Sequence, residues 1–273
     1  MDMRVFKRAY AKVFAVECSR EELAAVEMIT AAEILRLGTG MQRYVDVGGR
    51  IPRILVFCFG SSAQRQKAPP GISDWVKEPF GQGAWLREMR AAIALFGREI
   101  PIRQIVVHEL THGLLDVLTD GFPYPIALKE GFARRAEYLL PDDAGNVKWE
   151  RESLDQTRGD RRYWNAGDCV SIKDLVFFDV SEHWGQNMGA FLRMTEGSFW
   201  LNAYLFKVAK AHPRLKGILG ELRLNNVRTA EGVYLWLQEV SGMGEEKLEE
   251  SFHRFCTTGV VPDGGDAKGG RVL

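Results

Sequence analysis

The chain has 273 residues, with 36 basic and 36 acidic side chains and a formal net charge of zero. This balance gives no electrostatic basis for binding nucleic acid or an anionic membrane surface, so we expect no nucleic-acid partner. The hydrophobic fraction of 46% and the charged fraction of 26% are typical of soluble globular proteins, and no apolar run is long enough to span a membrane.

The N-terminus and the cysteines bear on the compartment. The first twenty residues are charged throughout and lack the apolar core of a signal peptide. Because the four cysteines are scattered and form no CxxC pair, we expect Cys18 and Cys58, in apolar strand-like runs, to be buried free thiols. The cytoplasm is therefore favoured, and a secreted or periplasmic location stays open if a signal peptide has been removed.

Residues 1–100 are predicted to form a small N-terminal α/β lobe. Short runs rich in β-branched and aromatic residues favour strands, and Ser19 with Glu22 three residues later forms a capping box before a helical apolar period. In chain order, the predicted elements are a strand at 11–18, a helix at 19–38, a strand at 53–60, a surface loop at 61–84 and a strand at 90–97.

Helical periodicity dominates from residue 102 onward. The elements are helices at 103–119 and 126–140, a charged loop or lid at 142–168, and helices at 171–179, 197–211, 213–224, 228–240 and 244–257. The fold class is therefore α+β, within a single domain over 1–260. It comprises the lobe 1–100, two central helices at 101–140 and a helical C-terminal lobe at 141–260, followed by a disordered tail at 261–273.

The segment "HELTH" at 108–112 carries the clearest chemical pattern. A helix advances about 100° per residue, so His108 and His112 share one face and can bind one metal ion, while Glu109 points to the flank of that face. Two imidazoles suit zinc, and the glutamate can act on a water molecule as a base. Asp116, one turn beyond His112, is predicted either to accept an imidazole N–H or to be an ordinary surface carboxylate.

The next predicted helix reads "PIALKEGFARRAEYLL", and its Glu130 follows His112 by 18 residues. The combination of HExxH with "EGFA" at 130–133 resembles the gluzincin metallopeptidases, and "L-x-E-G-x-A" is similar to their peptidase MA-like subgroup of uncharacterised bacterial proteins. The C-terminal segment "VYLWLQEVSGMGEEKLEESFHRF" is similar to the closing pattern of that subgroup. The resemblance implies that His108, His112 and Glu130 bind Zn²⁺.

The resemblance also implies a fold and a reaction. The fold would be a thermolysin-like zincin core with the active site in the cleft between the two lobes. The activity would be hydrolysis of peptide or protein substrates, with Glu109 as general base. A strand near 90–97 is expected to hold an extended peptide by β-addition.

The donor that stabilises the oxyanion is less well marked. The resemblance predicts a Tyr near residue 197, where this chain has Phe199 and Trp200. His183, in the polar segment "VSEHWGQN", is the favoured substitute, and Tyr204 is the other candidate; each could instead be a packed side chain. The alternative function is a zinc-binding protein that is weakly active or inactive. The sequence fixes no oligomeric state.

Overall fold

The structure is a computed structural model of the whole chain. It describes residues 3–7, 11–16, 20–21, 37, 54–59, 83–95, 102–138, 169–180, 188–208 and 217–258. The predicted helix at 19–38 lies mostly outside these residues. Cys18, His183, the predicted loop at 142–168 and the predicted disordered tail at 261–273 lie wholly outside them.

A mixed five-stranded sheet forms the N-terminal part, in the order β1-β2-β3-β5-β4. Its strands are β1 (Met3–Lys7), β2 (Ala11–Val16), β3 (Ile54–Phe59), β4 (Gly83–Leu86) and β5 (Ala91–Leu95). The strands β2, β3 and β5 are parallel, and β1 and β4 are antiparallel to their neighbours. The predicted strands at 11–18, 53–60 and 90–97 are thus confirmed.

Two strands were not predicted. The strand β1 lies in the charged N-terminal segment, and β4 begins at Gly83, inside the segment predicted as the end of a surface loop. The strand β4 is too short to show an alternating pattern in the sequence. Its position also corrects the expected peptide-binding strand: β5 pairs with both β3 and β4, so its backbone hydrogen-bonding groups are already used inside the sheet.

Side chains alternate between the two faces of the sheet, as strand geometry requires. Ile54, Val56 and Cys58 belong to the main hydrophobic core, which continues through the helices as far as Cys256. Phe59 and Ile93 belong to a second apolar cluster on the other face. The N-terminal and C-terminal parts thus share one continuous core on the helical side of the sheet.

The helical part contains seven described helices. They are α4 (Ile102–Leu118), α5 (Ile126–Tyr138), α7 (Ile172–Val176), α9 (Met188–Val208), α10 (Ile218–Leu224), α11 (Ala230–Ser241) and α12 (Glu245–Thr258). Each confirms a predicted helix, although α9 begins well before the predicted residue 197. Mixed α/β structure with a mainly helical C-terminal part is confirmed. Among the described helices, none is long and apolar enough to cross a membrane.

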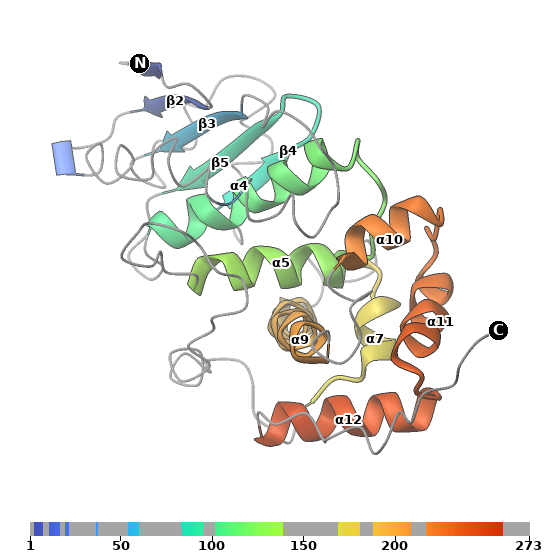
Figure 1. Cartoon of the computed structure of the whole chain (residues 1–273). Coiled ribbons are helices and arrows are strands. Elements are labelled where there is room, and N and C mark those ends of the chain that lie inside the picture. The colour runs from blue at the N-terminus through green and yellow to red at the C-terminus, as the bar shows by residue number, and fades with distance from the viewer. Residues whose placement is uncertain are drawn as a thin grey trace, which may run out of the picture.

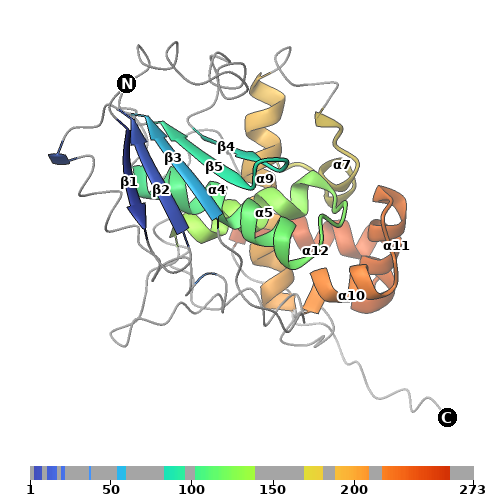
Figure 2. The ribbon, with the colours of Figure 1, turned by 90° about the horizontal axis from the view of Figure 1, so that it is seen from above.

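The helices form successive layers under the sheet (Figure 1). The helix α4 covers one face of the sheet, α5 packs beneath α4, and α9, seen end-on, packs beneath α5 and above α12. The view from above shows α4 running beneath the strands (Figure 2). The close approach of α5 to α9 requires Gly131, because a Cβ there would collide with the backbone oxygen of Ser198. Helix α5 is thus held between α9 on one side and α4 on the other.

The cysteines are closer in space than their scattered sequence positions suggest. Cys58 is a fully buried free thiol, as predicted. Cys169, just before α7, and Cys256, near the end of α12, are both free cysteines, and each thiol shifts the pKa of the other. The backbone N–H groups of Ile172 and Lys173 also donate to the carboxylate of Glu249 on α12, at 2.8 and 3.0 Å. Helix α7 is therefore fastened to α12.

Candidate metal centre

Helix α4 presents its two histidines toward α5. Leu110 and Leu114, on its other side, have no exposed surface and pack in the core. The imidazoles of His108 and His112 keep 17% and 13% of their side-chain surface, so the helix is immersed in the core while both rings stay accessible. The sequence spacing alone predicted this shared face.

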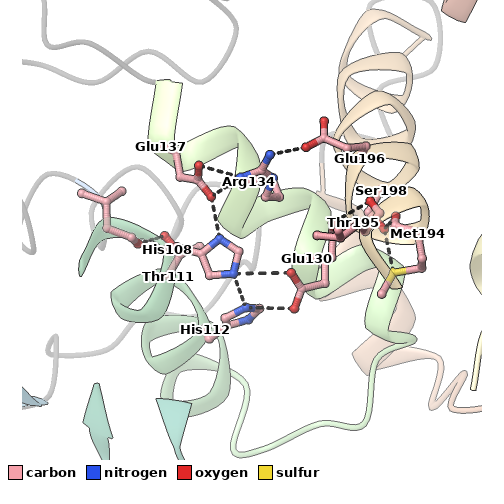
Figure 3. A network of polar contacts seen from close by, with 12 residues as sticks. His108, Thr111, His112, Glu130, Arg134, Glu137, Met194, Thr195, Glu196 and Ser198 are labelled. Atoms are coloured by element: carbon pink, nitrogen blue, oxygen red, sulfur yellow. Dashed lines mark hydrogen bonds and ion pairs between the residues drawn. The ribbon is translucent and has the colours of Figure 1, made fainter. Parts of the chain in front are cut away.

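Glu130 on α5 completes a three-ligand cluster with the two histidines. Figure 3 shows the three side chains pointing at one another, from α4 on one side and α5 on the other. The two Nε2 atoms are 3.1 Å apart. Oε2 of Glu130 lies 3.4 Å from Nε2 of His108, and Oε1 of Glu130 lies 3.2 Å from Nε2 of His112.

These separations are compatible with a bound metal ion. Bonds of about 2.0–2.1 Å at tetrahedral angles place neighbouring ligand atoms about 3.3 Å apart. The distance between the two Nε2 atoms lies close to that value, and each Nε2 contacts a different oxygen of the Glu130 carboxylate. With one ligand atom from each residue, all three lie within 4.8 Å of one another. Two nitrogens and one carboxylate are also a donor set that zinc prefers, and three protein ligands leave a fourth position open. The three residues therefore form a group that could hold a metal ion.

Glu109 lies on the flank of the histidine face, as predicted. Only 7% of the residue is exposed, and its side chain lies against Gly83 of β4. Burial raises the pKa of the Glu109 carboxyl, although the neighbouring His108 and His112 oppose that shift. A carboxylate with a raised pKa beside a metal position is suited to accept and return a proton.

A second carboxylate, Glu137, was not predicted. Its Oε1 lies 2.7 Å from Nδ1 of His108, so a neutral His108 can donate its Nδ1–H to Glu137 and turn Nε2 toward the metal position. Glu137 in turn accepts two hydrogen bonds from Arg134 at 2.9 and 3.1 Å, and Arg134 also pairs with Glu196 of α9 (Figure 3). Glu137 follows Glu130 by two helical turns, and this spacing could have indicated a shared face.

The cluster is electrostatically coupled. Burial alone would lower the pKa of His108, but its hydrogen bonds with Glu130 and Glu137 raise that pKa well above the ordinary value of 6.5. Burial would likewise raise the pKa of Glu130, but the two histidines lower it far below its usual range. In the metal-free site, positive charge on the His108 imidazole is thus favoured by the carboxylates around it.

Asp116 has neither of the two predicted roles. Its carboxylate accepts hydrogen bonds from Nε of Arg87, at 2.9 and 3.0 Å, and from Nε1 of Trp85, at 3.4 Å. Both donors come from the hairpin of β4 and β5, and only 14% of the Asp116 side chain is exposed. Asp116 therefore links α4 to the sheet, rather than orienting an imidazole or standing free at the surface.

The position of Tyr204 does not suit it to be the oxyanion donor, the role for which it was one of two candidates. Tyr204 is fully buried, and its ring packs against Phe252 and Phe255 of α12. The side of α9 that faces α5 carries Ser198 instead. Phe199 and Trp200, at the place where the resemblance predicts a Tyr, are also buried, each 3% exposed. Tyr204 is thus a core residue, as the alternative interpretation held.

Comparison of the sequence with models of known protein families and with curated proteins finds no match.

Proposed function

We propose that this protein is a zinc-dependent peptidase with the zincin-type arrangement of a metal-binding helix and a third ligand on the next helix. The observation that carries the proposal is the convergence of the His108, His112 and Glu130 ligand atoms, all within 4.8 Å of one another, with Glu109 on the flank of the histidine face. The resemblance of "HELTH" and "EGFA" to the gluzincins supports the same assignment.

Each residue then has a defined role. His108, His112 and Glu130 would bind the zinc, which when bound polarises a carbonyl group and lowers the pKa of water. The Glu109 carboxylate accepts the proton of the attacking water and returns it to the leaving amine. Glu137 keeps the Nε2 atom of His108 directed at the metal position, through the 2.7 Å contact with Nδ1.

The edge strand β4 is the strand that we propose for peptide binding, in place of the predicted strand at 90–97. Among the described strands, β4 ends the sheet and pairs on one side only, with β5. Its first residue, Gly83, lies against Glu109. An extended peptide added to this edge would pass beside the general base, and its main-chain groups would pair with β4.

The test compares Glu109→Gln with wild type on a denatured protein and on a peptide library. The amide keeps the shape of the side chain and all three ligands, so zinc content should stay unchanged while hydrolysis falls by about a hundredfold or more. Glu246→Gln, which changes an exposed carboxylate on α12, serves as the matched control and should leave hydrolysis unchanged. Equal cleavage by wild type and Glu109→Gln would contradict the proposal.

The second candidate function is a zinc-binding protein without peptidase activity. The burial of Tyr204 favours it, because a described candidate for the oxyanion donor faces α12 instead of the site. Full zinc binding with no cleavage of any peptide by wild type would select this alternative.

A further inference from the structure

The edge strand β4 and the metal-binding helix α4 touch at three successive positions. From the strand and the turn that follows it come Gly83, Trp85 and Arg87, every second residue; from the helix come Glu109, Gly113 and Asp116, about one turn apart. Alternation along a strand and the 3.6-residue period of a helix place each set on a single face. The two faces therefore meet along a line that includes the general base.

At the first position the strand backbone approaches Glu109 directly. A Cβ built at Gly83 would lie 2.6 Å from Oε1 of Glu109 and 2.8 Å from Cγ2 of Ile105, closer than real Cβ contacts allow. Residue 83 therefore has to be glycine if Glu109 is to keep its present orientation.

The second position is an aromatic contact. The indole of Trp85 lies over Gly113, the residue after His112, and a Cβ at Gly113 would lie 2.6 Å from the Trp85 ring. The same indole donates its N–H to Asp116 at 3.4 Å. The missing side chain at 113 thus allows the Trp85 ring to lie directly against the helix.

The third position fastens the strand to the end of the helix. The Arg87 guanidinium donates to the Asp116 carboxylate through both Nε and Nη2, and its Nη2 also donates to the carbonyl of Gly121 at 2.8 Å. Gly121 itself ends the helix, since its N–H donates to the carbonyl of Asp116 at 2.7 Å. Arg87 therefore contacts both a side chain and the C-terminal cap of α4.

We propose that the Arg87–Asp116 pair, together with Trp85 on Gly113, is a positioning device that sets the register of β4 against α4. The device keeps the backbone of Gly83 against Glu109 and so fixes the orientation of the base. Arg87 and Asp116 do not touch the metal ligands, and they act through the strand. The hydrolytic part of this inference rests on the proposed peptidase function; the register itself does not.

The Arg87–Asp116 ion pair positions β4 on α4 and contributes little to the overall stability of the protein. Half of the Arg87 side chain, 51%, is exposed, and ion pairs with such exposure contribute little to the free energy of unfolding. A lysine at 87 could not span the carboxylate and the Gly121 carbonyl in the same way, because it lacks the planar fork of arginine. Loss of the pair should therefore leave a folded protein in which β4 is free to shift along α4.

The experiment compares Arg87→Ala, Asp116→Ala and the double variant with wild type. In the single variants, hydrogen exchange at the amides of 84–87 should speed up by about tenfold or more, while zinc content stays unchanged. On a peptide that wild type cleaves, kcat should fall by about tenfold or more, because small displacements of a catalytic group have effects of this size. The double variant should resemble the single ones, since all three break the same pair.

Arg223→Ala is the matched control. Arg223 pairs with Asp120 at the same end of α4, at 2.8 Å, but it comes from α10. This variant should leave both exchange in β4 and kcat unchanged. Gly83→Ala tests the other end of the contact line: kcat should fall with zinc retained, because the new methyl group displaces Glu109.

The outcomes separate the inference from the proposed function. Unchanged exchange at 84–87 in Arg87→Ala and Asp116→Ala would overturn the register claim. Faster exchange with unchanged kcat would overturn the positioning role. If wild type cleaves no peptide, the peptidase proposal and its positioning role are both wrong, and the exchange data alone decide the register. A double variant with the product of the two single effects would show that the residues act independently, against the inference.

Discussion

Two stripes of the same helix, α4, are built in different ways. The first carries His108 and His112 and faces α5; the second carries Glu109, Gly113 and Asp116 and faces β4. The first stripe is made of residues whose chemistry is visible in the sequence. The second depends on two close approaches to β4 and on an ion pair with Arg87, none of which leaves a pattern along the chain.

The difference indicates how the proposed peptidase site would divide its requirements between the two stripes. Binding a metal ion requires donor atoms about 3.3 Å apart, which an i, i+4 pair and one further carboxylate supply. Orienting a base requires a neighbouring backbone at a fixed distance, and here that neighbour is Gly83 of β4. We therefore expect substitutions on the first stripe to act on metal content, and substitutions along the second to act on rate.

The largest effect is expected on the first stripe. Purified protein should contain about one zinc per chain, and His108→Ala, His112→Ala and Glu130→Ala should each lose most of it, because two remaining ligands bind zinc weakly. Elemental analysis measures this directly. Glu109→Gln, on the second stripe, should instead retain the metal, which would distinguish the roles of the two stripes. Full zinc retention in Glu130→Ala would remove the assignment of the third ligand.

A smaller effect is expected at Glu137 of α5, which contacts His108 of the first stripe. Glu137→Gln weakens the hydrogen bond to Nδ1 of His108 and should lower zinc affinity by about ten- to hundredfold. Competition with a chelator measures the affinity, and Glu246→Gln on the surface of α12 is the control. An unchanged affinity would mean that packing alone orients His108.

The sequence predicted the first stripe because its information is local. The spacing of His108 and His112 predicted their shared face, and the resemblance of "EGFA" to the gluzincin motif predicted that Glu130 joins them; the structure brings these three together. Strands β2, β3 and β5 and the seven described helices were likewise predicted from residue patterns. Periodicity within one element is a direct consequence of backbone geometry, so it can be recognised without knowing the neighbours.

The contacts of the second stripe with β4 could not be predicted, because the residues that make them are distant in the chain. Arg87 and Asp116 are separated by 29 residues, and nothing in either neighbourhood indicates the other. The short strand β4 has no alternating pattern, and Asp116 was interpreted from its helical spacing alone. The inward direction of Tyr204 was also undetermined, since an aromatic residue on a largely apolar helix can face either neighbouring layer.

The dependence of zinc affinity on pH tests the electrostatic coupling between His108 and the carboxylates around it. Zinc binds neutral imidazole, whereas the carboxylates around His108 raise its pKa well above 6.5 in the metal-free site. Zinc must therefore displace a proton, so its apparent affinity should rise with pH through the region above 6.5, by up to about tenfold per pH unit for one proton released. Chelator competition between pH 6 and pH 8 measures this, and a flat profile would contradict it.

The smallest effect is expected away from both stripes, at Tyr204 of α9. Its ring is enclosed by Phe252 and Phe255, and its hydroxyl lies 4.0 Å from Sδ of Met243. Tyr204→Phe keeps the ring in this packing and removes one hydroxyl, so the free energy of unfolding should change by about 1 kcal/mol or less. Because that hydroxyl faces α12, kcat and zinc content should stay within about twofold of wild type, the scale of a substitution that removes no interaction with the transition state. Chemical denaturation and peptide hydrolysis measure the two quantities. A fall in kcat of about a hundredfold with unchanged stability would instead make Tyr204 an oxyanion donor and would require α9 to turn toward the metal site.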